Sequence, residues 1–255
     1  MDCTELMEGG VTKSGVYTIY PRARLIGDKS VNVYCDMKTN GGGWTVIQRR
    51  GQYGNPEDYF VRTWKEYREG FGDLEKEFWI GNDYIYSITH QGEYAVRFEM
   101  LHRNGTSAYT RYENFWIENE EDKYKLRLSE ASGPAGDALS IHGGRNFYAK
   151  DQPNREKPND PLRSGGWWAN NLYTSSLNGL NLYGKPGPYF DGITWWDFGE
   201  YSSSLKATEI KVRPRIFIRE QLYQKPKNSL LLEKRPLCTN QYFKGGTSSM
   251  RLKSL

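Results

Sequence analysis

Three consecutive glycines followed by a tryptophan, Gly41-Gly-Gly-Trp44, constrain the fold of this chain more than any other feature. Glycine reaches backbone φ angles that other residues avoid, so three in a row indicate a forced backbone path. Residues 44–48 are then rich in aromatic and β-branched side chains, a composition typical of a strand. The sequence therefore predicts a tight turn that leads directly into a strand.

Short strands and turns are expected throughout residues 1–50, and the alternation of apolar and polar residues predicts further half-buried strands. These further strands are expected at residues 93–100, 107–112 and 124–128. Asn104-Gly-Thr106 indicates a turn between the first two of them. Trp64, Tyr67 and Phe71 recur at the spacing of a short amphipathic helix within residues 63–72.

Charge and motif content exclude several classes of function. The formal net charge is only +4, without the concentrated basic stripe that nucleic-acid binding needs, so no nucleic-acid partner is predicted. No run of 18 apolar residues occurs, which predicts no membrane span. His90, His102 and His142 show no metal-ligand spacing, and no HExxH, GxSxG or P-loop pattern is present. We therefore predict that the protein is not an enzyme, with His142 part of a loop turn rather than a catalytic base.

The order of motifs along the chain resembles the fibrinogen-related domain, the C-terminal module of ficolins, angiopoietins and fibrinogen chains. The likeness is greatest to the arthropod tachylectin-type, or techylectin-like, lectins, and it covers residues 2 to about 214. The segments that carry it are residues 35–50, 51–60, 70–72, 77–81, 133–139, 165–168, 177–179 and 201–208. The resemblance implies an α+β fold, in which a twisted antiparallel sheet with short helices supports a loop-rich C-terminal subdomain.

The same resemblance implies one fibrinogen C-terminal domain over residues 1–215. It would consist of an N-terminal segment (1–50), a central sheet region (51–131) and a loop-rich binding subdomain (132–215). Residues 216–255 do not resemble the family, and their basic, polar composition predicts a flexible tail. A functional tail is the alternative.

The family's N-terminal disulfide implies that Cys3 pairs with Cys35. Closing a loop of that length would contribute about 3–4 kcal/mol through the entropy of the unfolded chain. Cys238 is left over, and an odd cysteine in a secreted chain indicates an intermolecular bridge or a free thiol. The family is secreted, yet Met1 is followed at once by Asp2 and Cys3, so no signal peptide is present in this chain. We favour a missing upstream signal over a cytosolic protein, which makes Asn104 a candidate for N-glycosylation.

The resemblance places a calcium loop after residues 147–150. Asp151 matches the first ligand, but Pro153 stands at the second carboxylate position and offers no side-chain oxygen. Arg155 adds a repelling charge, and Asp160 is a candidate substitute from further along the chain, although nothing fixes it there. Because Ca²⁺ needs six to eight oxygen ligands, we expect a degenerate calcium site and no cofactor. Asp151 is then interpreted as a turn residue that bonds its own backbone.

The family's acetyl-group pocket is expected in the loop-rich subdomain. Tyr189 and Tyr201 match its aromatic positions, and Tyr173 stands where tachylectin-type lectins carry a histidine. Tyrosine rings suit an acetyl methyl group and also offer hydroxyls. Phe190 replaces a small residue and should narrow the pocket. Asn159 and Leu172 occupy the two cysteine positions of the family's second disulfide, so this staple is absent.

These features predict a secreted, lectin-like module that binds acetylated carbohydrates on microbes in innate immunity. Such sites bind weakly and act through multivalency, which is compatible with a homo-oligomer. The alternative is a degenerate or venom-type module for protein–protein interaction, without calcium or sugar binding. Retention of the pocket is indicated by Tyr189 and Tyr201, and decay by Pro153, Asn159, Leu172 and Phe190.

Overall fold

The computed structural model describes residues 1–22, 30–153, 165–169, 174–185, 191–199 and 204–215, which belong to one compact unit, Met1–Ile218. A second unit, Arg219–Leu255, lies wholly outside the described residues. The helices are α1 (Cys3–Glu8), α2 (Trp64–Glu69) and α3 (Asn82–Thr89), with 3-10 turns η1 (Thr39–Gly41) and η2 (Ser140–His142). The strands are β1 (Gly15–Ile19), β2 (Val31–Asp36), β3 (Trp44–Arg50), β4 (Phe71–Gly72), β5 (Phe78–Trp79), β6 (Tyr94–Leu101), β7 (Ser107–Ile117), β8 (Leu126–Ser132), β9 (Ser175–Ser176), β10 (Thr194–Trp195) and β11 (Ala207–Pro214).

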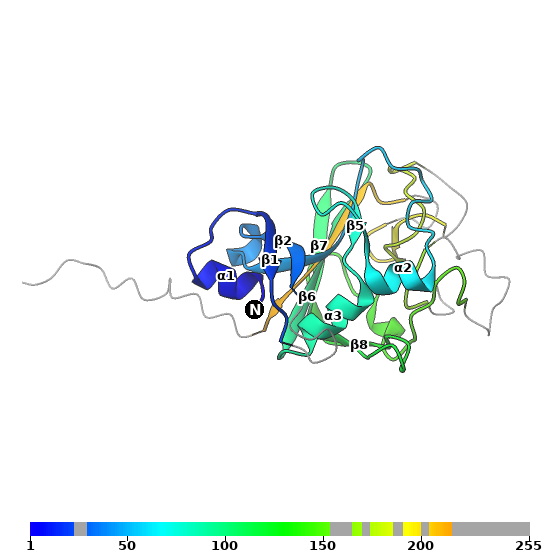
Figure 1. The fold of residues 1–255 in the computed structure, drawn as a ribbon. Coiled ribbons are helices and arrows are strands. Elements are labelled where there is room, and N and C mark those ends of the chain that lie inside the picture. Colours follow the sequence, from blue (N-terminus) through cyan, green and yellow to red (C-terminus); the bar gives the residue numbers. More distant parts are fainter. Residues whose placement is uncertain (23–29, 154–164, 170–173, 186–190, 200–203, 216–255) are drawn as a thin grey trace, which may run out of the picture. The chain divides into compact units, whose positions relative to one another are not determined.

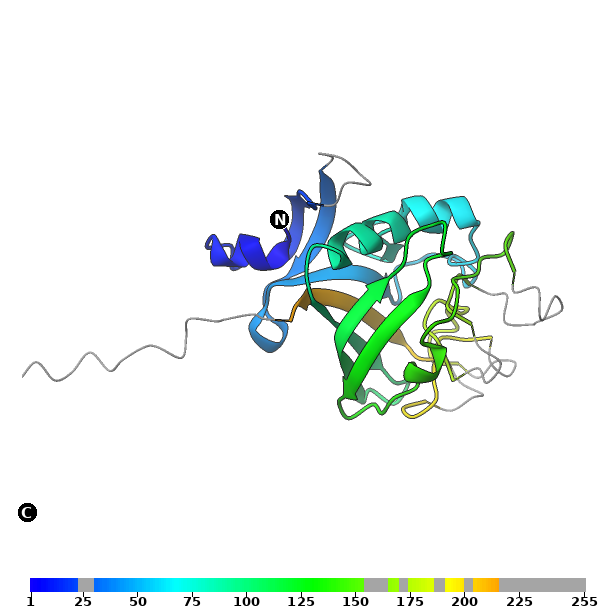
Figure 2. The same ribbon diagram turned by 90° about the horizontal axis from the view of Figure 1, so that it is seen from below.

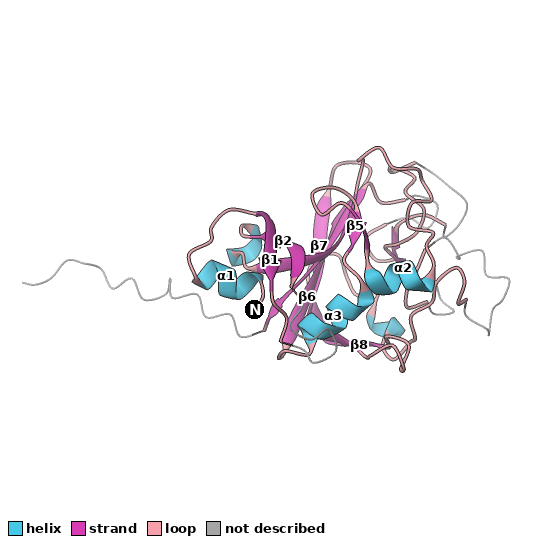
Figure 3. Cartoon of the chain, viewed as in Figure 1, coloured by secondary structure: helices cyan, strands magenta, loops and turns pink. Residues whose placement is uncertain are grey.

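An antiparallel sheet in the order β1-β2-β3-β11-β6-β7-β8 forms the framework (Figure 1), and β5 joins it beside β3 and β4. The last strand, β11, lies between β3 and β6, so Glu209 stands opposite both Arg49 and Glu99. Helices α2 and α3 lie side by side on one face of this sheet (Figure 2). Segments without regular structure gather at one end of it (Figure 3), where the loop-rich subdomain was predicted.

One face of the sheet forms the hydrophobic core. Phe98 of β6 and Ile210 of β11 are each 1% exposed, and they belong to one cluster with Ile85 of α3. The loop-rich region closes this cluster, because the Trp195 ring lies 5.5 Å from that of Phe98. Each buried side chain of this size stabilises the fold by about 1.5–3 kcal/mol. No described helix has the length and apolarity needed to cross a membrane.

The glycine turn follows the path that the sequence predicted. Gly41, Gly42 and Gly43 all have positive φ, and a Cβ on Gly42 would lie 2.4 Å from the carbonyl oxygen of Met37. Arg213 of β11 fixes the turn by donating to the carbonyl oxygen of Gly42 at 2.8 Å. Its guanidinium also lies 4.2 Å from the Trp44 ring centroid. The turn therefore joins the N-terminal segment to the last strand.

Cys3 and Cys35 form a disulfide, as predicted, and it joins α1 to β2. The helix itself is a correction, because only strands and turns were expected in residues 1–50. Asp2 explains it: the carboxylate Oδ1 accepts the backbone N–H groups of Thr4 at 2.9 Å and Glu5 at 3.1 Å. Such an N-cap satisfies donors that a helix start leaves free.

Three other local predictions need correction. Helix α2 stops at Glu69 because Gly70 adopts φ 92°, and Phe71 continues into β4 instead. Strand β8 starts at Leu126, since Tyr124 has φ 47° and cannot belong to a strand. Strand β6 was expected to be half-buried, yet Arg97 on its outer face is only 8% exposed. Its guanidinium carbon lies over the Tyr109 ring, 3.5 Å from the centroid.

Candidate functional site

Buried polar contacts attach the predicted binding loops to the sheet. Arg50 of β3 pairs with Glu77 at 2.7 Å and donates to the carbonyl oxygens of Leu177 and Gly179 at 3.2 and 2.8 Å. Asn178 accepts from Gln48 at 3.0 Å and donates to the Gly166 carbonyl at 2.7 Å. Residues 77–81, 165–168 and 177–179 each carry a motif of the family. The hydrogen bonds above join these three segments to strand β3.

Tryptophan side chains make the second set of attachments. The indole N–H of Trp168 donates to the Tyr124 carbonyl at 2.7 Å, and that of Trp195 donates to the Ala135 carbonyl at 3.0 Å. Strands β9 and β10 pair with each other and bring Ser175 opposite Trp195. These contacts tie the described parts of the loop-rich region to one another and to residues 124 and 135.

His142 is part of this framework. Its Nδ1 lies 2.6 Å from the Trp168 carbonyl oxygen, and its Nε2 lies 2.9 Å from the hydroxyl of Thr174. Burial lowers the pKa of His142 to about 4. A side chain that is 1% exposed and engaged at both nitrogens serves as a structural tie, as expected for a loop residue rather than a base.

The predicted pocket residues Tyr173, Tyr189, Phe190 and Tyr201 lie outside the described residues, as do Asn159 and Leu172. The described residues that flank these stretches are firmly held. The Thr174 hydroxyl oxygen lies 2.8 Å from the Ala138 carbonyl oxygen, and Lys185 N–H donates to the Leu182 carbonyl at 2.9 Å. On the far side, the Ser204 hydroxyl accepts the N–H of Ile193 at 3.1 Å. The pocket assignment thus remains a prediction on an anchored framework.

Asp151 has a defined role other than the expected one. Its Oδ1 accepts the backbone N–H of Trp64, the first residue of α2, at 2.7 Å, rather than bonding its own turn. Pro153, also described, contributes no side-chain oxygen. The part of this loop that the structure describes therefore offers one carboxylate, already engaged, and no group of three metal-ligating side chains occurs among the described residues. Residues 154–164 lie outside the described residues, so a degenerate calcium site stays a prediction.

Asn104 lies exposed in the turn between β6 and β7, as predicted. Its side-chain oxygen accepts the N–H of Thr106 at 2.9 Å, so the amide nitrogen that would carry a glycan is not used by this bond.

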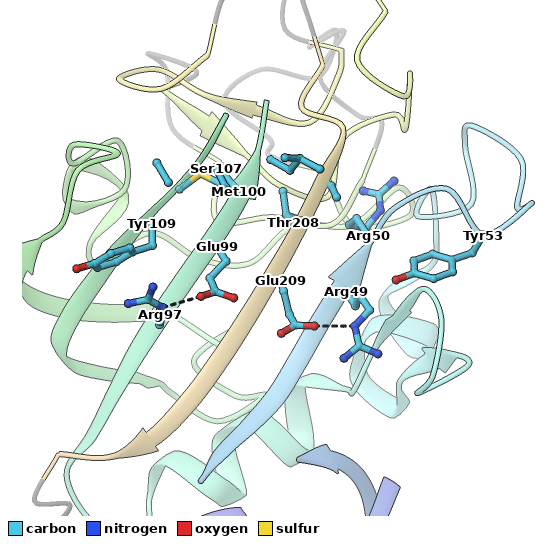
Figure 4. Close-up of a pocket in the computed structure, with 13 residues that line it drawn as sticks. Arg49, Arg50, Tyr53, Arg97, Glu99, Met100, Ser107, Tyr109, Thr208 and Glu209 are labelled. Atoms are coloured by element: carbon cyan, nitrogen blue, oxygen red, sulfur yellow. Dashed lines mark hydrogen bonds and ion pairs between the residues drawn. The ribbon is translucent and has the colours of Figure 1, made fainter. Parts of the chain in front are cut away.

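Sequence reasoning missed a groove of about 440 Å³ on the outer face of the sheet (Figure 4). Arg49, Glu209, Glu99 and Tyr109 stand in one row across β3, β11, β6 and β7. Two ion pairs lie within it, Arg49–Glu209 at 2.6 Å and Arg97–Glu99 at 2.8 Å. One sequence signal could have indicated this groove. Strands β6 and β11 each carry two oppositely charged residues two positions apart, Arg97 with Glu99 and Glu209 with Lys211.

Comparisons with known proteins agree with the fold. The family model of the fibrinogen beta and gamma chains, C-terminal globular domain, matches residues 1–215. Techylectin-5A of Tachypleus tridentatus is 45% identical over 216 residues, which cover 84% of this chain and 73% of that protein. Mouse tenascin-R is 41% identical over 218 residues, and the match again covers 84% of this chain but only 15% of tenascin-R.

Solved structures of the fibrinogen family show the same fold. The fibrinogen-like globe domain of human ANGPTL2 superposes with a TM-score of 0.77 at 34% identity, covering 84% of this chain and 98% of that one. Lamprey fibrin D-dimer, complexed with the peptide ligand Gly-His-Arg-Pro-amide, gives 0.76 at 30% identity, with 92% and 78% covered. The predicted α+β fold is confirmed.

Proposed function

Since the chain belongs to the fibrinogen C-terminal domain family, a family of recognition modules rather than enzymes, we propose that it is a secreted lectin-like module for acetylated carbohydrates. The observation that carries this proposal is the 45% identity to techylectin-5A across 84% of the chain. The Cys3–Cys35 disulfide supports secretion, because such bonds persist in oxidising compartments. Microbial surface sugars are the proposed target, and multivalent display in a homo-oligomer would raise the avidity.

The proposed site is the loop pocket of Tyr189, Tyr201, Tyr173 and Phe190. Support comes from its surroundings: the flanking residues Thr174, Lys185 and Ser204 are fixed by hydrogen bonds. Ordering a loose loop on binding costs free energy, so an anchored framework favours affinity. Phe190 should lower the affinity, because its ring is expected to narrow the pocket.

Binding to an acetylated resin, with elution by N-acetylglucosamine in the presence and absence of EDTA, tests the proposal. In calorimetry, Tyr201→Ala should abolish the heat of binding, and Phe190→Ala should strengthen binding by widening the pocket. Strong binding that survives Tyr189→Ala and Tyr201→Ala together would place the ligand site elsewhere.

A protein-binding module is the second candidate. Tenascin-R at 41% identity and the peptide-bound lamprey fibrin favour it, together with Pro153, Asn159 and Leu172 in place of the family's polar and cysteine residues. Two results together would select this candidate: the domain does not bind acetylated resin, and the immobilised domain retains a protein that carries no glycans.

A further inference from the structure

The sheet-face groove, defined by Arg49, Glu209, Glu99, Arg97 and Tyr53, contains two similar ion pairs side by side (Figure 4). In each, the arginine Nε donates to a glutamate oxygen, at 2.6 Å for Arg49 and 2.8 Å for Arg97. Each guanidinium also lies over a tyrosine ring, Arg49 at 4.1 Å over Tyr34 and Arg97 at 3.5 Å over Tyr109. Both side chains are therefore fixed before any ligand arrives.

Lys211 holds the two glutamates in place. Glu99 and Glu209 stand opposite each other in the register of β6 and β11, an arrangement that like charges disfavour. The Lys211 ammonium bridges them at 2.7 and 2.6 Å and reaches Asp36 at 2.7 Å. Burial alone would raise the pKa of Glu99, but Lys211 and Arg97 hold it below its ordinary value. The Glu99 carboxylate thus remains an ionised acceptor.

Unused hydrogen-bonding capacity remains on both pairs. Within the described part of the chain, the terminal guanidinium nitrogens of Arg97 have no protein partner. Arg49 uses one of its two terminal guanidinium nitrogens, which donates to the Leu74 carbonyl at 2.9 Å. The carboxylate side chains of Glu99 and Glu209 are 30% and 21% exposed, so water or a ligand reaches them.

The alternation of charge decides which ligand suits this groove. An anion drawn to either arginine meets the adjacent glutamate, and a cation drawn to either glutamate meets the adjacent arginine. A hydroxyl group can accept from a guanidinium, and its neighbour on the next carbon can donate to the paired carboxylate. We propose that this groove is a second ligand site, in which vicinal diols of a neutral oligosaccharide bridge the Arg49–Glu209 and Arg97–Glu99 pairs.

The size of the groove and its aromatic end agree with this ligand. Four strands at ~4.8 Å spacing give the row a length of about 14 Å, which accommodates a di- or trisaccharide. Tyr53, 40% exposed, ends the row beyond Arg49 and offers a ring and a hydroxyl (Figure 4). Its position depends on Gly51, where a Cβ would lie 2.9 Å from the Tyr53 ring.

Titration of the ¹⁵N-labelled full chain with cellotriose, laminaritriose and mannotriose, none of which carries an acetyl group, tests the proposal. We expect at least one of them to shift the Nε–H resonances of both Arg49 and Arg97, and its per-O-methylated form to shift neither. Arg97→Lys keeps the charge but loses the planar donors, so affinity should fall about tenfold. Arg127→Lys is the matched control, because Arg127 pairs with Glu118 through Nε at 2.8 Å outside the groove. Tyr53→Ala, which leaves both ion pairs in place, should also weaken binding.

Several results would overturn the proposal: no shift with any of the three trisaccharides, equal binding by the methylated form, or equal weakening by Arg97→Lys and Arg127→Lys. Binding restricted to a sulfated trisaccharide and lost at high salt would assign the groove to anions instead. The proposal does not rest on the loop pocket, since the probes lack acetyl groups. Variants of Tyr189 and Tyr201 should leave these shifts unchanged.

Discussion

The backbone N–H of Trp64 donates to the carboxylate of Asp151 at 2.7 Å, across 87 positions of sequence. Thr63 and Glu66 already form a capping box at this end of α2, so Asp151 satisfies a further donor of the same helix start. A negative charge there also interacts favourably with the helix dipole. The residue that matches a family calcium ligand is thus part of a helix cap.

Asp151→Ala should lower the free energy of unfolding by about 1 kcal/mol through loss of this cap. The same loss should appear with and without millimolar calcium, because Pro153 leaves the predicted calcium loop without its second carboxylate. Chemical denaturation measures both, and the exposed Asp122→Ala is the control. A wild-type melting temperature that rises with calcium, and no longer does so in Asp151→Ala, would establish a calcium site.

Acid should weaken the domain through His142. Burial lowers its pKa from 6.5 to about 4, so the unfolded chain binds the proton more readily between these values. Stability should therefore fall as pH drops from 6.5 to 4, by on the order of 3 kcal/mol. His142→Gln should flatten this part of the stability curve whatever its effect at neutral pH, whereas the exposed His90→Gln should not. Equal slopes in His142→Gln and the wild type would contradict the assignment.

Lys211→Met should destabilise the domain by about 3 kcal/mol, because it leaves Asp36, Glu99 and Glu209 without their shared cation. Burial raises the pKa of Asp36, but the bond to Lys211 outweighs it and sets the pKa well below the ordinary value. That stabilisation is present above the ordinary pKa and is lost as pH falls. The variant should consequently lose less stability than the wild type below pH 4. The exposed Lys206→Met is the control; a similar effect there would argue against a specific role for Lys211.

Removing the disulfide by Cys3→Ala with Cys35→Ala should cost about 3 kcal/mol, since the bond closes a loop with a separation of 32 residues. Urea denaturation of oxidised protein gives the value. Cys238→Ala should leave it unchanged, and non-reducing gels of that variant show whether Cys238 forms an intermolecular bridge. Unchanged stability in the double variant would mean that α1 is held by its other contacts alone.

A chain that ends at residue 215 should fold with the melting temperature of the full chain. Residues 216–255 lack the family's motifs, and the family model matches only residues 1–215. Calorimetry on both chains measures the difference. A large fall in melting temperature would show that the tail packs on the domain.

The sequence by itself determined the features that depend on neighbouring residues. Three glycines in a row permit the positive φ that Gly41, Gly42 and Gly43 adopt. The order of motifs was sufficient for the family and for the Cys3–Cys35 pair. The N-cap of α1 also depends on neighbouring residues alone, since Asp2 accepts from the N–H groups of Thr4 and Glu5. An aspartate at this position is a sequence signal that could have predicted the helix.

Only the tertiary structure decided what lies across the sheet. Arg49 and Glu209 are 160 positions apart, and their pairing depends on the insertion of β11 between β3 and β6. A shift of one residue in that register would turn Glu209 and Lys211 toward the core, and their charges would no longer line the groove. Asp151 likewise reaches Trp64 only because a loop returns to a distant helix. Local signals fix backbone angles and caps, whereas a site built from several strands exists only once long-range register has set its side chains on one face.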